Sequence, residues 1–314
     1  MKAVGLTEFG GPEVLKILDL PDPAAGPGQV LIRIHAAAVN PTDSLIRSGE
    51  HVRMFGQTAP LPYVPGMDAA GILVGVGEGV ETNLQVGDRV MAFIGPLGSY
   101  GAYSELIAVS ANSVVKTPPA LTDVEASTVL MNAMTARVAL DTLDLAPGSK
   151  IVVTGAAGTF GGYAVELAKE AGLFVIADAS DSDRAAVADF GADLILPRGD
   201  NLAARVRAQF PAGVDGAIDG ALLNEELAPA VKDGATVVTL RMYSNVGERG
   251  VRFVPIRSKM HSEEWQKLDQ LRQLVEDGRL TIRVAGVYPK EQAADAHKRL
   301  DEGGLRGRLV LTFE

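Results

Sequence analysis

The sequence predicts an α/β protein in which a doubly wound parallel sheet is joined to a second, β-rich domain. Three observations predict this class. A strand, a glycine turn, a helix and another strand follow one another between residues 150 and 177. Helix and strand patterns alternate after Thr122, and the region before it consists of short β-rich runs. At 314 residues the chain is long enough for two domains.

Residues 1–121 have the features of a compact β-barrel-like domain. Their hydrophobic runs are short and are separated by glycine and proline, and helical periodicity is sparse. We expect strands at Val30–Ala36, Ala70–Val76, Arg89–Phe93 and Ser104–Val109.

From Thr122 the chain alternates between helix and strand. Parallel strands connected by helices of this length form a doubly wound sheet, which binds its ligand at the carboxyl ends of the strands. We expect helices at Val124–Leu143, Phe160–Ala171, Arg184–Phe190, Leu202–Gln209 and Glu225–Val231, and strands at Lys150–Thr154, Phe174–Ala177, Asp193–Leu196, Asp215–Asp219 and Ala235–Leu240.

The C-terminal part ends in a pattern similar to that of residues 1–121. We therefore expect residues 282–314 to complete the first domain and residues 122–281 to form the nucleotide-binding domain. The expected elements are an edge strand at Val251–Val254, an amphipathic helix at Glu263–Glu276, strands at Arg283–Val287 and Arg308–Phe313, and a helix at Lys290–Leu300.

Composition excludes several classes of function. The chain has no cysteine, so disulfides, thiolate nucleophiles and cysteine metal sites are ruled out. A net charge of −10 with scattered basic residues argues against a nucleic-acid partner. We find no signal segment and no apolar run of membrane-spanning length, so we expect a cytoplasmic protein with no membrane partner.

The glycine turn predicts a dinucleotide site. Gly155 and Gly158 allow a sharp turn and a close approach of the backbone to a pyrophosphate, and Gly161 lets the next helix pack closely on the strand. The helix N-terminus then offers N–H groups to the phosphates. An ordinary strand-to-helix turn is the alternative. The expected cofactor contacts are Gly155, Ala156, Ala157, Gly158, Thr159, Phe160 and Gly161.

Several motifs in the same order resemble those of the medium-chain dehydrogenase/reductase superfamily, in its zinc-free quinone oxidoreductase branch with the zeta-crystallin-like proteins. The resemblance implies a Rossmann domain and a GroES-like catalytic domain. The motifs are Asn40-Pro-Thr-Asp43, Pro65-Gly-Met-Asp-Ala-Ala-Gly71, Gly75-Val-Gly77, Val86-Gly-Asp-Arg-Val90, Gly101-Ala-Tyr-Ser-Glu105, Met134-Thr-Ala136, Gly155-Ala-Ala-Gly-Thr-Phe-Gly161 and Gly307-Arg-Leu-Val310.

Zinc enzymes of this superfamily hold their catalytic metal through a cysteine and a histidine. This chain has Asn40 and Met67 in the corresponding regions, and an amide and a thioether are poor zinc ligands. The four histidines do not form a ligand spacing. We therefore expect no metal. Reduction of an activated double bond or quinone, which needs positioning and a hydrogen-bond donor, is favoured over alcohol oxidation.

The end of the second strand of the nucleotide unit bears on the choice between NADPH and NADH. By resemblance, the selecting acid falls on Ala179, and Ser180 and Arg184 would receive a 2′-phosphate. Asp178, Asp181 and Asp183 crowd the same segment and would repel that phosphate. Capping of the next helix by Asp181 or Ser182 is an alternative role for this segment. We favour NADPH, with NADH as the alternative.

The resemblance implies further site residues. Asn40 and Asp43 would face the nicotinamide and substrate, although both residue types also form turns. Thr135 would approach the nicotinamide, or bond its own helix backbone. No proton donor is evident: His51, Tyr63 or solvent could serve. The remaining expected cofactor contacts are Leu240, Arg241, Met242 and Arg308.

The predicted function is zinc-independent hydride transfer from NADPH to a quinone or α,β-unsaturated carbonyl. Enoyl-thioester reduction and non-catalytic NADP binding are the alternatives.

The strand Gly250–Pro255 predicts a homodimer, because an apolar sheet edge is best satisfied by its two-fold mate. Val251 and Phe253 would lie near the axis. The alternative is a monomer with its edge covered by Glu263–Glu276.

Overall fold

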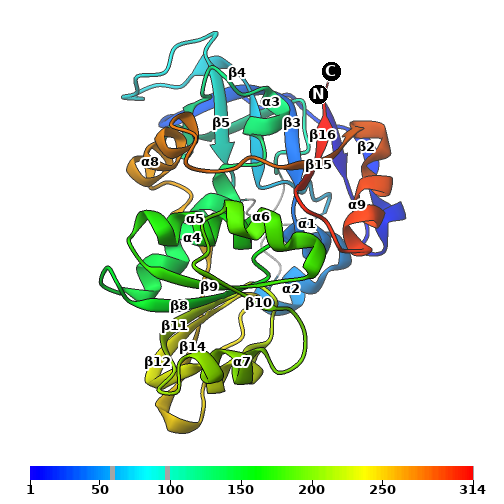
Figure 1. Ribbon diagram of the computed structural model, residues 1–314. Coiled ribbons are helices and arrows are strands. Elements are labelled where there is room, and N and C mark those ends of the chain that lie inside the picture. The colour runs from blue at the N-terminus through cyan, green and yellow to red at the C-terminus, as the bar shows by residue number, and fades with distance from the viewer. Residues whose placement is uncertain (57–60, 96–99, 314) are drawn as a thin grey trace. The chain divides into compact units, whose positions relative to one another are not determined.

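Two units, each with its own hydrophobic core, make up the computed structural model, which describes residues 1–56, 61–95 and 100–313 (Figure 1). Unit 1 comprises Met1–Met131, Lys259–Gly278 and Ile282–Glu314, and unit 2 comprises Asn132–Ser258 and Arg279–Thr281. From the sequence, we expected the segment 263–276 in the nucleotide-binding domain. The structure instead groups this segment with unit 1.

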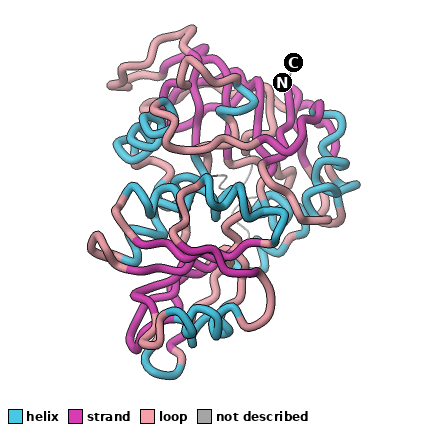
Figure 2. The backbone as a smooth tube through the Cα atoms, in the orientation of Figure 1, coloured by secondary structure: helices cyan, strands magenta, loops and turns pink. Residues whose placement is uncertain are grey.

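Unit 2 is built on a seven-stranded sheet whose order is β10-β9-β8-β11-β12-β14-β13. All neighbouring strands are parallel except β13 and β14. Helices α5 and α6 lie on one face of the sheet and α7 on the other, as a doubly wound fold requires (Figures 1 and 2). The strands are β8 (Lys150–Thr154), β9 (Phe174–Ala179), β10 (Leu194–Pro197), β11 (Val214–Asp219), β12 (Val231–Thr239), β13 (Asn245–Val246) and β14 (Arg252–Pro255), and the helices are α5 (Thr159–Glu170), α6 (Arg184–Asp189) and α7 (Leu202–Gln209).

Three expectations about this part of the chain are wrong. The segment expected as one helix from Val124 to Leu143 is two helices, α3 (Asp123–Ala126) and α4 (Leu130–Leu143). A 3-10 segment, Asn224–Ala230, replaces the expected helix at Glu225–Val231, since Pro229 lies inside it and cannot donate a backbone hydrogen bond. Strand β14 is not the sheet edge, because β13 pairs with its outer side.

Unit 1 contains a second seven-stranded sheet. Six of its strands follow the order β15-β16-β3-β4-β5-β7, and the seventh, β6, pairs with β3; β1 and β2 form a separate antiparallel pair. Strand β16 pairs with β3 in the register Leu309↔Val39, so the C-terminal tail does complete this sheet. The strands are β1 (Lys2–Gly5), β2 (Lys16–Asp19), β3 (Gln29–Val39), β4 (Asp68–Val76), β5 (Arg89–Phe93), β6 (Leu106–Ser110), β7 (Val114–Lys116), β15 (Val284–Pro289) and β16 (Arg308–Thr312).

Two adjacent helices in unit 1 were not expected from the sequence. Helix α1 (Pro41–Ser48) begins at the N-cap Asn40 with proline in its first turn, and it ends at Gly49, whose φ of +78° suits glycine. Helix α2 (Glu50–Phe55) follows at once. The other helices of this unit are α8 (Trp265–Glu276), which contacts β7, and α9 (Ala293–Asp301).

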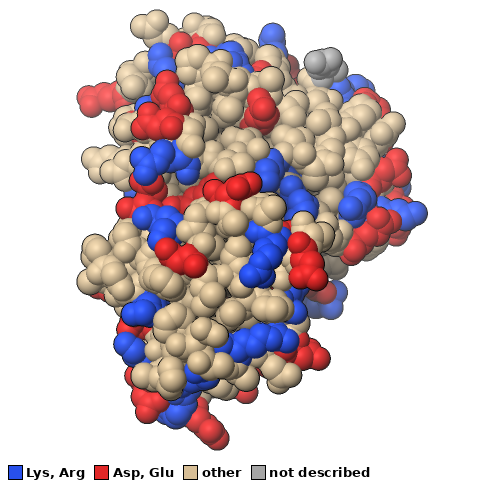
Figure 3. Space-filling model, viewed as in Figure 1, with Lys and Arg blue, Asp and Glu red and all other residues tan. Residues whose placement is uncertain are grey.

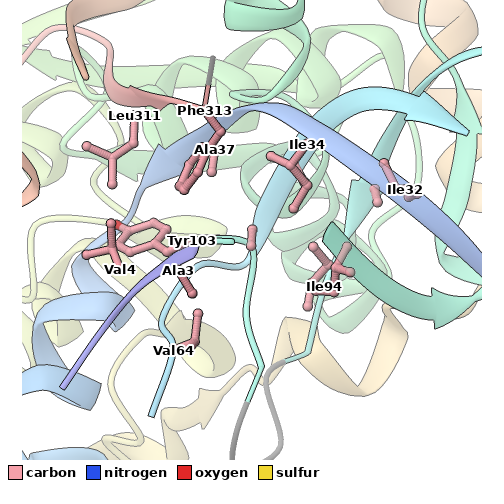
Figure 4. Packing of buried hydrophobic residues seen from close by; sticks show 14 of the residues in the cluster. Ala3, Val4, Ile32, Ile34, Ala37, Val64, Ile94, Tyr103, Leu311 and Phe313 are labelled. Carbon is pink, nitrogen blue, oxygen red and sulfur yellow. The ribbon is translucent and has the colours of Figure 1, made fainter. Parts of the chain in front are cut away.

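Every second side chain in the first part of β3 is buried, and these side chains belong to the core of unit 1. Val30, Ile32 and Ile34 are fully buried, whereas Arg33 between them is exposed. Their side chains meet residues from β1, β16 and the loops, including Tyr103 and Phe313 (Figure 4). Each such buried side chain contributes about 1.5–3 kcal/mol relative to an exposed one.

The surface agrees with the composition. Acidic and basic side chains are interspersed over the face seen in Figure 3. Among the described residues, none of the helices has the length and apolarity needed to cross a bilayer.

Candidate active site

The glycine turn between β8 and α5 has three different backbone requirements. Gly155 adopts a φ of +66°, which favours glycine. A Cβ on Gly161 would lie 2.7 Å from the Cα of Ala156, and closer still to the carbonyl oxygen of Gly155. Any larger residue at 161 would therefore push α5 away from the turn. The expected packing role of Gly161 has a direct geometric basis.

Gly158 differs from its neighbours because the space around it is open. It is the N-cap of α5, with an ordinary φ of −76°, and a Cβ there would meet only the Gly155 carbonyl oxygen, at 3.2 Å. The first N–H groups of a helix have no acceptor within the helix, and together they form a binding site for an anion. Gly158 therefore lies where a ligand could approach the backbone.

Asp178, near the end of β9, is turned back toward the glycine turn. Its side chain is 4% exposed, and Oδ1 accepts a hydrogen bond of 3.1 Å from the backbone N–H of Ala156. Oδ2 lies 3.6 Å from Nε of Arg198. This carboxylate is thus committed to the protein, and the next residue, Ala179, is buried as well.

The two residues expected to bind a 2′-phosphate also have partners within unit 2. The hydroxyl of Ser180 donates to Asp183 at 2.6 Å, and Nη2 of Arg184 donates to the carbonyl oxygen of Ile195 on β10 at 3.2 Å. The side chain of Arg184 thus lies along β10. Its assignment to the phosphate remains a prediction.

The segment after β12 shows unusual backbone conformations. Arg241 and Met242 have φ values of +51° and +66°. Two consecutive non-glycine residues in this region cost on the order of 1–3 kcal/mol each, and such strain is concentrated at functional sites. Nε of Arg257 lies 3.3 Å from the sulfur of Met242. The expected cofactor segment Leu240–Met242 is therefore a constrained turn.

A hydrogen bond joins the carboxyl ends of two neighbouring strands, β8 and β11, whose last residues were not expected in the site from the sequence. The Thr154 hydroxyl donates to Asp219 at 2.7 Å, and the second oxygen of Asp219 accepts the backbone N–H of Asn224 at 2.7 Å. Both side chains are fully buried. Thr154 and Asp219 could have been predicted from the sequence, because each is a polar residue at the end of a parallel strand. Thr135 lies half-buried on α4.

In unit 1, Asn40 and Asp43 form the capping box of α1. The backbone N–H of Asn40 donates to Oδ2 of Asp43 at 2.8 Å, and that of Gly66 donates to Oδ1 at 2.9 Å. Both side chains are fully buried. Burial raises the pKa of Asp43 to about 6, and the two backbone donors limit the rise.

A second buried carboxylate, Asp68, binds the side-chain amide of Asn40. Nδ2 of Asn40 donates to Oδ2 of Asp68 at 3.1 Å, and the backbone N–H of Met131 donates to Oδ1 at 2.7 Å. Burial raises the pKa of Asp68 to about 7, although the Arg308 charge opposes the rise. The sequence analysis did not assign Asp68, although it lies next to Met67 in a quoted motif.

Asp43 receives a third hydrogen bond from Tyr103, a residue that the sequence analysis did not assign. The hydroxyl donates to Oδ2 at 3.2 Å, and it lies 3.1 Å from Nε2 of His297 on α9. Since its one hydrogen goes to Asp43, Nε2 of His297 must carry a hydrogen and donate to Tyr103. Burial, aided by Arg47, lowers the pKa of His297 to about 3, so the ring is neutral.

The two candidate proton donors have other surroundings. Tyr63 is 4% exposed, belongs to the core of unit 1, and exchanges backbone hydrogen bonds with Leu6. His51 is partly exposed on α2, and burial together with the charge of Lys259 lowers its pKa. Arg308 begins β16 and is near enough to act on both buried carboxylates.

Comparison with known proteins establishes the family. Residues 26–119 match the model of the alcohol dehydrogenase GroES-like domain, and residues 190–311 match that of the zinc-binding dehydrogenases. Quinone oxidoreductase from Rattus norvegicus is 31% identical over 99% of this chain and 97% of its own. The chain belongs to the medium-chain dehydrogenase/reductase superfamily, in its quinone oxidoreductase branch. The expected fold class, a Rossmann domain with a GroES-like domain, is confirmed.

Other relatives differ in their recorded activity and cofactor. The 2-methylene-furan-3-one reductase of Solanum lycopersicum is 30% identical over 99% of this chain and 79% of its own. Among solved structures, a mycobacterial protein complexed with NADPH has a TM-score of 0.86 at 28% identity, with both chains fully covered. An NAD-dependent alcohol dehydrogenase has the same TM-score, identity and coverage. The superfamily assignment makes this chain an oxidoreductase, and the substrate and the choice of nicotinamide cofactor are separate questions.

Proposed function

We propose that this oxidoreductase transfers hydride from NADPH to a quinone or an α,β-unsaturated carbonyl compound without zinc. The observation that carries the proposal is the open N-terminus of α5 at Gly158, in a chain similar over its full length to a quinone oxidoreductase. The tomato relative, a reductase by name, supports the extension to enones.

The side chains at the metal positions of zinc relatives favour a reaction without metal. Asn40 is bound to Asp68 through its amide, and Met67 is 4% exposed. Within the described ranges, no three histidine, aspartate or glutamate side chains are grouped to hold a metal. A hydride acceptor that is already polarised needs no Lewis acid, only orientation and a donor to its oxygen.

Each unit contributes a distinct part of the proposed mechanism. When bound, NADPH supplies the hydride. The first turn of α5 would hold the pyrophosphate, for which Gly158 leaves room. In unit 1, Asp43 binds the backbone N–H of Asn40 and Asp68 binds its side-chain amide. The loop at Asn40 would orient the substrate. Because their pKa values are near 6 and 7, these two carboxyls are able to hold or release a proton at neutral pH.

We also propose a homodimer, formed through a different strand from the one expected. Val251 is fully buried and Phe253 is 2% exposed in the core of unit 2, so neither can lie at a two-fold axis. Strand β13 forms the edge, and Val246 on it is 71% exposed. Pairing with a second copy would cover this exposed apolar side chain and satisfy the backbone groups of the two-residue edge.

The function is tested by following NADPH oxidation with quinones, enones and enoyl thioesters, in the presence and absence of a chelator. Turnover of quinones or enones that survives chelation supports the proposal. Selective turnover of enoyl thioesters would establish the alternative reductase activity. NADPH binding without turnover of any acceptor would indicate a non-catalytic binding protein.

A further inference from the structure

We propose that Arg198 binds the 2′-phosphate of NADPH and thereby selects it over NADH. This inference rests on the proposed function and assigns the phosphate to a residue other than Ser180 and Arg184. It starts from the position of Arg198, which directly follows the last residue of β10. Its backbone N–H donates to the carbonyl oxygen of Ala179 at 2.9 Å, beside the end of β9. In doubly wound folds the adenosine ribose lies at the end of this strand.

The acidic side chains of this strand end are turned inward. Asp178 is bound to the Ala156 N–H and faces Arg198, and Asp183 is 7% exposed and accepts the Ser180 hydroxyl. A carboxylate that prefers NADH must reach the ribose hydroxyls. Neither of these two can do so without giving up a hydrogen bond within the protein. Asp181 is exposed and is the negative charge that a phosphate would have to tolerate.

The guanidinium of Arg198 is available to a ligand. Its side chain is 46% exposed, and its partner among the described residues is Asp178, at 3.6 Å. At 3.6 Å this is a loose contact, so the exposed side of the guanidinium can bind a phosphate while Arg198 still faces the buried Asp178. The other two arginines near this sheet edge, Arg184 and Arg205, donate to backbone carbonyl oxygens of β10. Arginine also matches phosphate with paired N–H donors.

Arg198 has a second effect through Asp178. Its positive charge faces this carboxylate and offsets repulsion between the carboxylate and a 2′-phosphate. Loss of Arg198 therefore removes the attraction between its guanidinium and the phosphate. It also leaves the repulsion between Asp178 and the phosphate without an opposing charge. NADH has no phosphate at this place, so its binding should change little. The inference therefore predicts a selective effect on the phosphorylated nucleotide.

The experiment measures dissociation constants by calorimetry for NADPH, NADH and 2′,5′-ADP, which carries the phosphate but no nicotinamide. The proteins compared are the wild type, Arg198→Met, Arg198→Lys and Arg184→Met, which removes the arginine that the resemblance assigns to the phosphate. Arg198→Met should weaken NADPH and 2′,5′-ADP about 10- to 100-fold and NADH less than about threefold. Arg198→Lys should restore part of the loss. Unchanged thermal melting establishes that each variant is folded.

The outcomes separate this inference from the function on which it rests. If the wild type binds neither NADPH nor NADH, the proposed function is wrong and the assignment of Arg198 is wrong with it. If NADPH binds but Arg198→Met weakens NADPH and NADH equally, or leaves both unchanged, only the assignment of Arg198 is overturned. A selective loss in Arg184→Met alone would place the phosphate at Arg184.

Discussion

Asn40 donates its side-chain amide to Asp68 at 3.1 Å, and this bond fixes which face of the amide the loop presents. The second Asp68 oxygen accepts the Met131 N–H, so the carboxylate has no freedom to turn. Asp43 holds the backbone of Asn40 from the other side. The loop at Asn40 is thus positioned by two buried carboxylates, one on helix α1 and the other on strand β4.

This arrangement predicts a role for Asp68 in catalysis through Asn40. In Asp68→Asn the new amide must present its oxygen to Met131, so its NH₂ meets the NH₂ of Asn40 and one amide has to flip. We expect kcat to fall about 10- to 100-fold, since misplacing an orienting group is costly, while the dissociation constant of NADPH stays the same. Steady-state kinetics and calorimetry measure both. Asp189→Asn, at an exposed site, is the control, and an unchanged kcat in Asp68→Asn would contradict the role of Asp68.

Asp68 should also make stability depend on pH. Its folded pKa is about 7, against the ordinary value of 3.8, so between these values the folded state binds more protons than the unfolded state. The free energy of unfolding contributed by Asp68 therefore falls as pH rises from about 4 to 7. Relative to Asp68→Asn, the wild type should lose stability over this range. Urea unfolding of both proteins at pH 5, 6, 7 and 8 measures the difference, and a constant difference would rule out the raised pKa.

Two glycines of the nucleotide turn should respond in opposite ways to substitution. Gly161→Ala places a methyl group against the backbone of Gly155 and Ala156, so we expect a lower melting temperature. Gly158 has an ordinary φ and open space, so Gly158→Val should stay folded but lose NADPH binding. Circular dichroism and calorimetry distinguish the two effects. Tight NADPH binding by a folded Gly158→Val protein would show that the pyrophosphate does not bind at this turn.

Activity should survive prolonged chelation. Asn40 and Met67 are not competent zinc ligands, so elemental analysis of the purified protein should find less than one zinc per chain. Turnover before and after dialysis against a chelator measures the effect. Loss of turnover that zinc restores would show that the proposed metal-free reaction is wrong.

The edge strand predicts the outcome of two matched substitutions. Val246→Lys places a charge on the exposed edge, and light scattering at micromolar concentration should show the mass of a monomer where the wild type is a dimer. Phe253→Ala removes a core side chain instead and should lower the free energy of unfolding by about 3–5 kcal/mol. A monomeric wild type would contradict the dimer.

The sequence predicted the regular elements well where the local pattern determines them. The bounds of β5, β8 and α7 match those expected, because periodicity and flanking turns are contained in the segments themselves. Helices α1 and α2 were missed because they are short and contain polar residues, although Asn40-Pro41 and Gly49 are ordinary helix boundaries. Strand β13 is two residues long and has no pattern of its own.

The candidate site was less predictable because its contacts join distant positions. Asp43 and Tyr103 are 60 residues apart, and Tyr103 and His297 are 194 apart. Nothing local to His297 distinguishes it from a surface histidine. Asp178 lies near the end of β9 and Arg184 begins α6, but the direction of each side chain decides which charge faces a ligand. That direction depends on the tertiary structure, in which Arg184 donates to Ile195 while Arg198 lies beside the end of β9.

The pairing of β16 with β3 has a consequence for how the chain is made. On the ribosome, β3 emerges long before its partner in the register Leu309↔Val39, because the two strands are far apart in the sequence. The sheet of unit 2 lies within Asn132–Ser258, so all its strands are available sooner. We expect the nucleotide-binding unit to be able to fold before β16 emerges, and the sheet that contains β3 to close only after β16 has emerged.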